Sequence, residues 1–311
     1  YEKEDRWKRQ SDVDKCIHKG VRLVMLDSSG NVLDARGVPF KCLDFYTDFF
    51  SEVLLSTMDS MLHIGFSENE LFLSGVSSDD YDNYYLPVID SLHHQILAST
   101  YKEDYPGFEY YGFNTEDSTF KTLREVVDIE LMEQFRSEYK WLSTRDKLNA
   151  KRLEIATGID KEIFGAYMTG FSNSPYYNAL YAPLFVENDS VFVFDHYADF
   201  MYTYTQNYEK LDSVPISYHK GKTSRFWEEQ VIFDQGNGNA YTVFRRNGNC
   251  YLQGIDKKSG ESLGNFKMFH RYPENLVIKN GEVYYVYRPF ESPQKKFLYR
   301  EDIYLKEIAI R

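Results

Sequence analysis

The chain has 311 residues, of which 42% are hydrophobic, 27% charged and 17% aromatic. This composition supports a substantial packed core and excludes wholesale disorder. The formal net charge of −12 argues against nucleic acid as the main partner and against adsorption to anionic membranes, because both depend on a basic surface. The sequence has no run of about 18 apolar residues, so we expect no transmembrane helix.

Cysteine and histidine positions do not indicate a metal site or a disulfide framework. The cysteines are Cys16, Cys42 and Cys250, widely spaced and without a CxxC pair. We expect three buried thiols, with one bridge and one free cysteine as the alternative. The other scattered candidates are His63, His196, His219 and His270, with the adjacent pair His93 and His94. We therefore expect no metal and no cofactor, and the sequence has no GxGxxG, P-loop, GxSxG or HExxH motif.

The first 60 residues combine a charged lead-in with a hairpin signal. Residues 1–20 are rich in charge and are expected to be exposed, with a short helix as one form. The chain begins at Tyr1, so we expect a native N-terminus, with any export signal or lipid anchor, to precede it. Residues 21–27 and 32–36 flank a Gly-containing turn and predict a hairpin. Residues 40–58 could form strands or a short helix.

The clearest structural unit covers residues 183–216. It predicts four short strands separated by turns at Asn188–Asp189, residues 196–199 and residues 206–209. In its second strand, Val191 and Val193 face one side, and Phe192 and Phe194 face the other. Strands rich in Val, Phe, Tyr and Thr between Asn- and Asp-containing turns are typical of a meandering antiparallel sheet.

This unit is repeated along the chain. A polar turn followed by an alternating strand occurs at residues 66–75, 186–195, 234–244 and 278–287. The strand starts at Ser190, Ala240 and Glu282 are 50 and 42 residues apart. Blades of a β-propeller recur at about 40–50 residues. The repeat therefore predicts an all-β protein in which four-stranded antiparallel blades form a β-propeller.

Counting the units gives five blades, or six if residues 21–58 add one. The expected blades are residues 60–100, a disrupted one at about 105–170, then 180–217, 229–268 and a last one from 275. The last blade lacks a clear fourth strand, which the N-terminal hairpin could supply and so close the ring. We predict a single propeller domain over residues 21–311, with a helical insertion at about 115–155.

Residues 118–148 have the spacing of an amphipathic helix. Apolar side chains three and four positions apart are Phe120, Leu123, Val127, Leu131, Phe135, Tyr139 and Leu142. Ser118 or Thr119 could cap the start, and Gly158 lies beyond the end. We expect this inserted helix to pack on the propeller flank, with a partner-binding or lid helix as the alternative.

The sequence resembles the six-bladed β-propeller families (TolB-like and NHL-like) that are common among exported lipoproteins of Bacteroidetes. The stretches that carry this resemblance are VENDSVFVFDHYADFMYTYTQNYEKLDSVPI and NAYTVFRRNGNCYLQGIDKKSGESLG, within residues 180–303. The resemblance implies the fold and a location outside the cytoplasm, in the periplasm or anchored at the outer membrane of the cell envelope. It implies no reaction.

The candidate binding residues lie in loops that would open on one face of the propeller, where function is commonly found. They are Tyr176, Tyr177, Tyr197, Arg225, Trp227, Arg246, His270, Arg271, Tyr272 and Arg288. Arg together with aromatic side chains suits a carboxylate, a sugar or a peptide. The alternative is that Trp227 and several tyrosines fill the central channel or pack between blades.

The favoured function is a non-catalytic, exported binding or scaffold propeller. It would engage a glycan, a peptide, a carboxylate or an envelope protein on its loop face, and no nucleic acid. One alternative is a hydrolase acting on a glycan or an ester through strand-end carboxylates, for which Asp195, Asp199 and Asp234 are the candidates. Another is a structural member of an envelope complex that uses the 118–148 helix as its contact. The sequence determines neither the ligand nor the oligomeric state.

Overall fold

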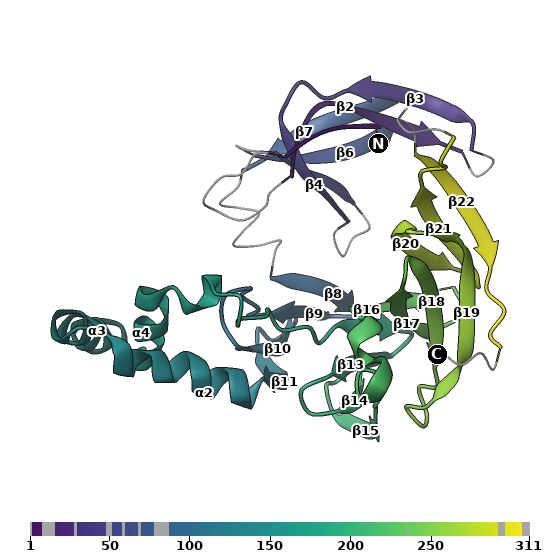
Figure 1. The fold of residues 1–311 in the computed structure, drawn as a ribbon. Helices are drawn as coiled ribbons and strands as arrows, with labels where there is room; N and C mark the ends of the chain where they lie inside the picture. Colours follow the sequence, from purple (N-terminus) through teal and green to yellow (C-terminus); the bar gives the residue numbers. More distant parts are fainter. Residues whose placement is uncertain are drawn as a thin grey trace. The chain divides into compact units, whose positions relative to one another are not determined.

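The computed structural model shows a chain built mainly of antiparallel β-sheets (Figure 1). It describes residues 2–7, 16–27, 30–47, 52–57, 60–67, 70–77, 87–234, 236–291 and 296–306. The chain divides into two compact units, one formed by Tyr1–Thr100 with Tyr111–Phe120 and one formed by Tyr101–Tyr110 with Lys121–Arg311.

The first unit contains a seven-stranded sheet in the order β1-β2-β4-β5-β6-β7, with β3 paired to β2. Its strands are β1 (Glu2–Trp7), β2 (Cys16–Leu26), β3 (Val32–Gly37), β4 (Cys42–Thr47), β5 (Val53–Thr57), β6 (Met61–Ser67) and β7 (Glu70–Val76). The predicted hairpin is confirmed, since β2 and β3 pair with Leu23 opposite Arg36. The ambiguous stretch 40–58 forms the strands β4 and β5. The short helix considered for residues 1–20 is wrong, because β1 and the start of β2 pair there.

The predicted blade at residues 60–100 is wrong. Its strands β6 and β7 complete the seven-stranded sheet, whereas β8 (Val88–Leu92) and β9 (Gln95–Ser99) belong to a sheet in the order β11-β10-β9-β8. That sheet continues with β10 (Gly107–Asn114) and β11 (Phe120–Val127). Part of the strand expected at residues 83–89 lies outside the described residues. Local patterns found the strands, but hydrogen bonding between strands distant in sequence decided how they group.

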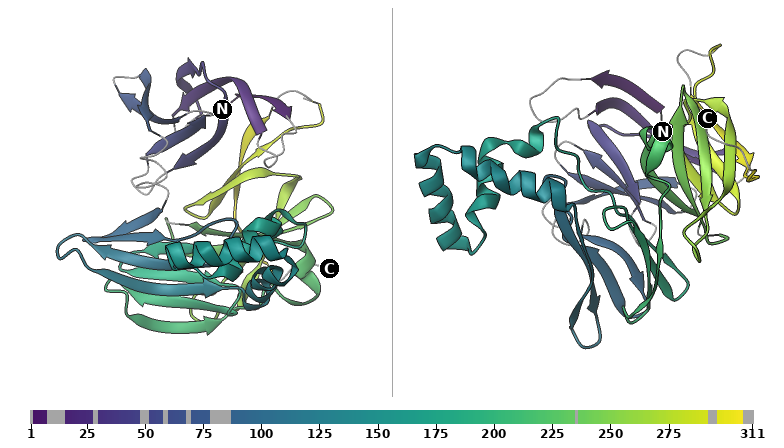
Figure 2. Two further views of the ribbon diagram at one scale, coloured as in Figure 1. Left: turned by 90° about the vertical axis from the view of Figure 1, so that its left-hand side faces the viewer. Right: turned by 60° about the horizontal axis from the view of Figure 1, so that its bottom comes forward.

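The single helix expected at residues 118–148 is replaced by a strand and several helices. Residues 120–127 form β11, and the helical segment that follows contains α2 (Ile129–Ser137), the 3₁₀ helix η2 (Glu138–Trp141), α3 (Thr144–Thr157), α4 (Lys161–Thr169) and η3 (Phe171–Asn173). Figures 1 and 2 show that α2, α3 and α4 form a helical segment beside the sheets of the second unit.

Capping residues explain these helix boundaries. The carboxylate of Asp128 accepts a hydrogen bond from the Leu131 backbone N–H, so α2 begins there and not at Ser118 or Thr119. Ser143 and Asp160 cap α3 and α4 in the same way. Gly158 ends α3 in the left-handed conformation at φ 76°, as its place beyond the predicted helix indicated. These capping residues therefore divide the stretch into separate helices, although its apolar side chains are spaced as in one helix.

The second unit contains the predicted meander in consecutive sheets. Sheet C is β12 (Leu184–Glu187), β13 (Ser190–Asp195), β14 (Phe200–Thr205) and β15 (Lys210–Pro215). Sheet D is β16 (Trp227–Asp234), β17 (Asn239–Arg246), β18 (Asn249–Ile255) and β19 (Ser262–Arg271). Sheet E is β20 (Glu274–Lys279), β21 (Glu282–Tyr287) and β22 (Phe297–Asp302). The meander predictions for residues 183–216 and 229–268 are confirmed.

Successive sheets of this unit bury side chains between them. One core joins sheets C and D through Phe192, Phe194 and Phe233. A second joins sheets D and E through Val243, Leu252 and residues of β20 and β21. In β13 both the valine face and the phenylalanine face are buried, so that strand is covered on two sides. Sheet E has three described strands, and the hairpin β2–β3 is paired within the seven-stranded sheet. Blade number and ring closure stay predictions.

Candidate functional site

A cation–aromatic cluster lies where the 3₁₀ helix η4 (Gly221–Phe226) meets the end of β17. The Arg225 guanidinium lies 4.7 Å from the centre of the Phe226 ring, and the Arg246 guanidinium lies 5.1 Å from it. Cations at such distances are attracted to the ring face, and the contact restrains a long side chain. Arg225 is exposed and Arg246 is half-buried. Phe226 therefore holds two guanidinium groups at one place on the surface.

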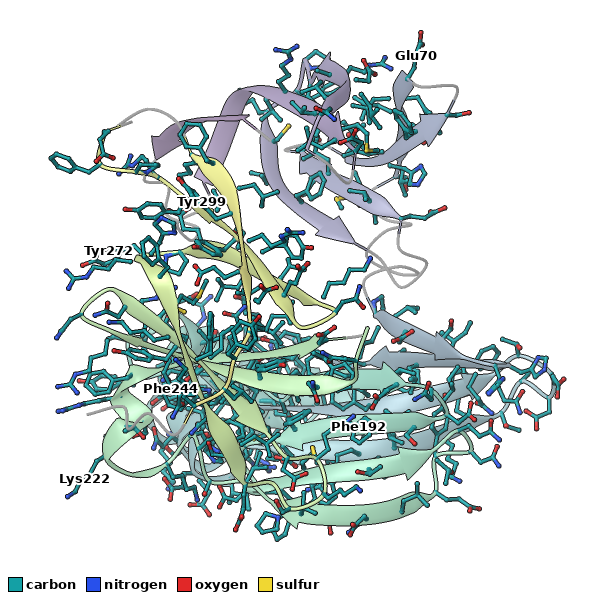
Figure 3. All side chains as sticks on the ribbon, turned by 90° about the vertical axis from the view of Figure 1, so that its right-hand side faces the viewer. Glu70, Phe192, Lys222, Phe244, Tyr272 and Tyr299 are labelled. Carbon is teal, nitrogen blue, oxygen red and sulfur yellow. The ribbon has the colours of Figure 1, made fainter. Side chains whose placement is uncertain are left out.

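A tight turn brings Tyr272 to the same end of sheet D. Asn247 and Gly248 join β17 to β18 with φ values of 50° and 78°, as a two-residue hairpin turn requires. The Tyr272 backbone N–H donates a 2.8 Å hydrogen bond to the Gly248 carbonyl. A Cβ atom at Gly248 would lie 2.3 Å from the Tyr272 ring, so the glycine makes room for this approach. Tyr272 is 62% exposed and lies at the end of sheet D (Figure 3).

The cations of this surface are not neutralised within the described residues. The side chains of Arg225, Arg246 and Arg271 take part in none of the ion pairs found there. The neighbouring Arg245, by contrast, pairs with Glu228 at 3.1 Å and also donates to the Pro273 carbonyl. We call the surface formed by Arg225, Phe226, Arg246, Arg271 and Tyr272 the arginine patch. In a chain of net charge −12 it is a local concentration of positive charge.

Trp227, which follows η4 directly, is a packing residue. Its indole N–H donates a 2.8 Å hydrogen bond to the Thr242 hydroxyl. Its ring lies 4.7 Å from His196 and 5.6 Å from His219 between ring centres, with Tyr181 and Tyr218 also in contact. We call these five rings the histidine–aromatic cluster. Trp227 is therefore packed among aromatic rings, and whether this layer lies between blades stays a prediction.

His196 is held in one neutral tautomer within that cluster. Its Nδ1 atom lies 2.9 Å from the Tyr181 carbonyl, which can only accept, so Nδ1 carries the proton. Nε2 is then the acceptor for the Tyr218 hydroxyl at 2.7 Å. Burial lowers the pKa of His196 to about 4, and the same cause raises the pKa of Tyr218 well above its usual value. Both rings are therefore neutral over the physiological range.

His219 joins the buried cluster to the surface. Its Nε2 atom lies 3.0 Å from the Asp199 carboxylate, which also pairs with Lys220. Burial lowers the pKa of His219, and Asp199 partly offsets this effect. The buried Nδ1 atom of His219 has no hydrogen-bond partner among the described residues. The Asp199 carboxylate is therefore hydrogen-bonded to the His219 ring and paired with the Lys220 ammonium group.

The remaining predicted site residues lie in other surroundings. The Tyr197 hydroxyl accepts a hydrogen bond from the Tyr181 backbone N–H, so it supports the chain before sheet C. Tyr177 packs against Phe171, and Tyr176 is 79% exposed. None of the contacts found among the described residues joins these three tyrosines to the arginine patch. They do not form one site with it.

His270 and Arg288 also lie apart from the patch by their contacts. The His270 ring stacks on Tyr287 at 4.3 Å and lies 4.4 Å from Tyr299, and its Nδ1 atom is 2.5 Å from the Tyr285 hydroxyl. The Tyr285 hydroxyl donates its one proton to the Glu301 carboxylate. His270 is therefore part of the packing around sheet E. Arg288 lies just beyond the end of β21 and is exposed.

The three carboxylates proposed for a hydrolase have structural partners. Asp195 is 1% exposed, pairs with Arg124 at 2.8 Å and accepts the Tyr197 and Ala198 backbone N–H groups. Asp234 is fully buried and accepts backbone N–H groups from Gly236, Asn280 and Gly281, which ties the turn of sheet D to the turn of sheet E. Asp195 and Asp234 therefore fix turns, as strand-end Asp residues commonly do, and Asp199 is paired with His219 and Lys220.

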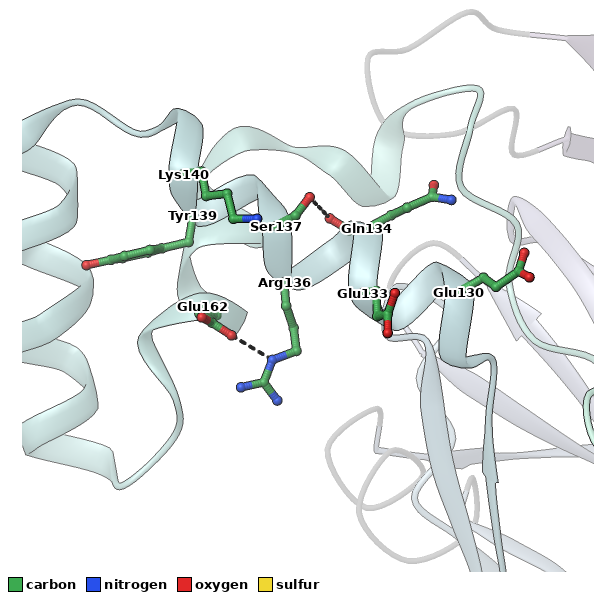
Figure 4. Close-up of a pocket in the computed structure, with 8 residues that line it drawn as sticks. All are labelled: Glu130, Glu133, Gln134, Arg136, Ser137, Tyr139, Lys140 and Glu162. Atoms are coloured by element: carbon green, nitrogen blue, oxygen red, sulfur yellow. Dashed lines mark hydrogen bonds and ion pairs between the residues drawn. The ribbon is translucent and has the colours of Figure 1, made fainter.

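A hollow in the helical segment was not anticipated from the sequence. It has a volume of about 670 Å³ and lies on α2, η2 and α4 (Figure 4). Its lining residues are Glu130, Glu133, Gln134, Arg136, Ser137, Tyr139, Lys140 and Glu162. Arg136 is neutralised by Glu162 at 2.7 Å and by Asp160 at 2.5 Å. The sequence contains one signal for this hollow. The capping residues divide the stretch into separate short helices, and the hollow lies where α2, η2 and α4 meet.

Metal-binding clusters and membrane-spanning helices are absent from the part of the chain that the structure describes. There, His, Cys, Asp and Glu side chains do not gather in groups of three or more that could hold a metal ion. Every helix in those residues is too short or too polar to cross a lipid bilayer. Cys42 and Cys250 are free and buried.

No protein-family model and no curated protein matches the chain. Among solved structures, it is similar to a luciferin-regenerating enzyme at 10% identity and a TM-score of 0.43, covering 99% of this chain and 93% of that one. It is similar to BamB from Moraxella catarrhalis at 9% identity and a TM-score of 0.28, covering 93% and 72%. It is also similar to the β-propeller domain of the Trilobed protease from Pyrococcus furiosus at 12% identity and a TM-score of 0.32, covering 86% and 82%.

Proposed function

We propose that the chain is a non-catalytic β-propeller that binds an acidic peptide segment at the arginine patch. The support for a propeller is the repeated meander of sheets C, D and E and the apolar cores between successive sheets. If the seven-stranded sheet is counted as β1–β3 and β4–β7, the strands form six groups, as in the six-bladed families that the sequence resembles.

The observation that carries the binding function is that the guanidinium groups of Arg225 and Arg246 both lie over the Phe226 ring. A guanidinium group presents a fork of N–H donors that matches a carboxylate, and stacking on a ring leaves these donors available at its edge. Because the two groups are already restrained by the ring, less conformational entropy is lost when a ligand binds. Arg271 and the exposed Tyr272 would extend the surface along a peptide and add apolar contact area.

We propose a protein without catalysis because the three candidate carboxylates have structural partners. Asp195, Asp199 and Asp234 each accept hydrogen bonds or ion pairs that fix the fold. A glycosidase needs one free carboxylate and one protonated one on either side of its substrate. No observation favours the hydrolase alternative over binding.

The test is direct binding of fluorescein-labelled hexaglutamate to the purified chain, followed by fluorescence anisotropy. We expect binding that weakens as salt is raised, because it rests on charge. The double variant Arg225→Ala/Arg246→Ala should bind at least about tenfold more weakly, since each carboxylate loses a charged hydrogen-bond donor. Arg300→Ala is the matched control, because Arg300 pairs with Glu282 on sheet E. Equal affinity of the double variant and the parent would refute the assignment, as would binding of a neutral oligosaccharide in place of hexaglutamate.

We also propose that the protein acts outside the cytoplasm, in the cell envelope, as a lipid-anchored protein. The resemblance to exported lipoprotein propellers supports this location. Fractionation of cells that express the full-length gene tests it. Recovery of the protein with the cytoplasmic fraction would contradict the proposal.

A further inference from the structure

The helix α3 has two faces of different character. Asp146, Ala150 and Leu153 lie on the face that is buried or half-buried, and α3 packs there against α4. The opposite face is exposed and consists of Arg145, Leu148, Asn149, Lys151, Arg152, Ile155 and Ala156. Leu148 is 58% exposed and Ile155 is 78% exposed. Figure 1 shows α3 at the outer end of the helical segment.

The outward face of α3 carries cationic and apolar side chains and the neutral Asn149, but no acidic side chain. Arg145, Leu148, Arg152 and Ile155 are three or four positions apart, so they form one stripe along the helix. The acidic residues of α3 are not on this stripe, because Asp146 bonds to the Ser143 cap and Glu154 pairs with Lys161. Among the described residues, the side chains of Arg145, Lys151 and Arg152 take part in none of the ion pairs found.

The complementary surface lies on α2 of the same chain. Glu130 and Glu133 are exposed, line the hollow and take part in no ion pair among the residues described. Ile129 beside them is 70% exposed. The hollow is also lined by two cations, Arg136 and Lys140. The charge of Arg136 is balanced by Asp160 and Glu162. The hollow therefore presents the carboxylates of Glu130 and Glu133 beside the cations Arg136 and Lys140, and these two carboxylates complement the stripe of α3.

We infer that α3 of one copy of this chain docks on the α2 hollow of a second copy, and that the second copy returns the same contact. The arrangement would be a two-fold dimer, in which each copy supplies one basic stripe and one acidic hollow. Arg145 and Arg152 would face Glu130 and Glu133, while Leu148 and Ile155 cover Ile129. This interface is independent of the arginine patch and of the proposed peptide binding.

The order of residues on the stripe favours a protein surface over a lipid surface. A helix that lies in a membrane interface separates its apolar face from its basic face. On α3 the arginines alternate with Leu148 and Ile155 along one line, so inserting the apolar side chains would carry the guanidinium groups with them. Alternating charge and apolar contact suits a partner whose carboxylates alternate in the same way.

The experiment measures the mass of the full chain by sedimentation velocity over a range of concentration and salt. We expect a dimer that dissociates as salt is raised. The α3 variant Arg145→Glu/Arg152→Glu and the α2 variant Glu130→Arg/Glu133→Arg should each be monomeric, with dimerisation weakened by about a hundredfold or more, because like charges then face each other. Lys267→Glu/Lys279→Glu is the control, since both lysines are exposed on strands of sheets D and E.

Mixing the two monomeric variants is the decisive step. In the mixed pair, the reversed α3 stripe meets the reversed α2 hollow, and the other contact is the native one, so a heterodimer should form. A mixture that stays monomeric overturns the inference, and so does a parent chain that is monomeric at every concentration. A dimer that survives both charge reversals, or a monomer that floats with vesicles of anionic phospholipid, also overturns it. Circular dichroism and thermal unfolding of both variants exclude loss of folding as the cause.

Discussion

The Arg124 guanidinium donates two hydrogen bonds to one carboxylate oxygen of Asp195, at 3.0 and 2.8 Å. The contact joins β11 to the end of β13, across 71 residues of sequence. Arg124 also lies 4.0 Å from the centre of the Tyr202 ring, so the guanidinium group is fixed on two sides. The charge of the buried Asp195 is thereby compensated.

Replacing Arg124 should destabilise the protein strongly. Arg124→Met keeps the apolar stem but leaves the Asp195 carboxylate buried without its counter-charge, and we expect a loss of about 3 kcal/mol in the free energy of unfolding. Arg136→Met removes a more exposed pair and should cost at most about 1 kcal/mol. Urea unfolding of both variants measures the difference. Equal losses would show that the Arg124 pair is not buried in the way described.

Acidification should weaken the fold through His196. Its pKa is about 4 in the fold, compared with 6.5 for an ordinary histidine. The unfolded chain therefore takes up a proton at a higher pH than the fold does, and the free energy of unfolding falls as the pH drops from 6.5 towards 4. Between about pH 7.5 and about pH 5, His196 should account for a loss of about 2 kcal/mol.

His196→Gln isolates this contribution, because the amide can still donate to the Tyr181 carbonyl and accept from Tyr218. Urea unfolding at the two pH values should show a smaller pH-dependent loss in the variant than in the parent protein. A variant as pH-sensitive as the parent would mean that other groups, such as the carboxylates or His219, produce the effect.

Two glycines test whether the turn positions Tyr272. Gly248→Ala and Gly221→Ala both place a Cβ at positive φ, 78° and 83°, so each should cost about 1–2 kcal/mol in the free energy of unfolding. Only at Gly248 does the new Cβ meet the Tyr272 ring, whereas nothing lies within 4 Å at Gly221. We expect Gly248→Ala alone to weaken hexaglutamate binding several-fold, by displacing the exposed ring. Similar binding by the two variants would remove Tyr272 from the patch.

Phe226 should matter for binding through its ring. Phe226→Leu keeps an apolar side chain but loses the attraction for both guanidinium groups, worth about 0.5–1 kcal/mol each at an exposed site. Hexaglutamate should then bind about threefold to tenfold more weakly. Phe226→Tyr preserves the ring and should restore affinity. If the Leu and Tyr variants bind equally well, stacking does not organise Arg225 and Arg246.

Local sequence signals predicted individual strands well and their grouping less well. The turn residues Asn188 and Asp189 and the alternating β13 are local features, and the four strands of sheet C lie within a residue or two of their predicted bounds. The blade expected at residues 60–100 failed because the grouping of strands depends on hydrogen bonds to distant segments. The helix at residues 118–148 failed because part of an apolar period of three and four was used by the strand β11.

The candidate site, too, was predicted only in part from the sequence. The sequence predicted Arg225, Arg246, Arg271 and Tyr272 as surface binding residues by their residue types and their loops. It could not predict that Arg225 and Arg246 both contact the Phe226 ring, because the two arginines are 21 positions apart in the chain. Trp227 was also a candidate, and only its contacts with His196 and Thr242 place it in the packed layer.

The sequence by itself determined the meander of residues 183–216 and 229–268, since turn chemistry and two-residue alternation act over short distances. The tertiary structure decided which arginines are free, which carboxylates are used to fix turns, and that α3 presents a cationic face while its acids are paired. These properties depend on neighbours that are distant in sequence, because charge pairing and burial are set by packing.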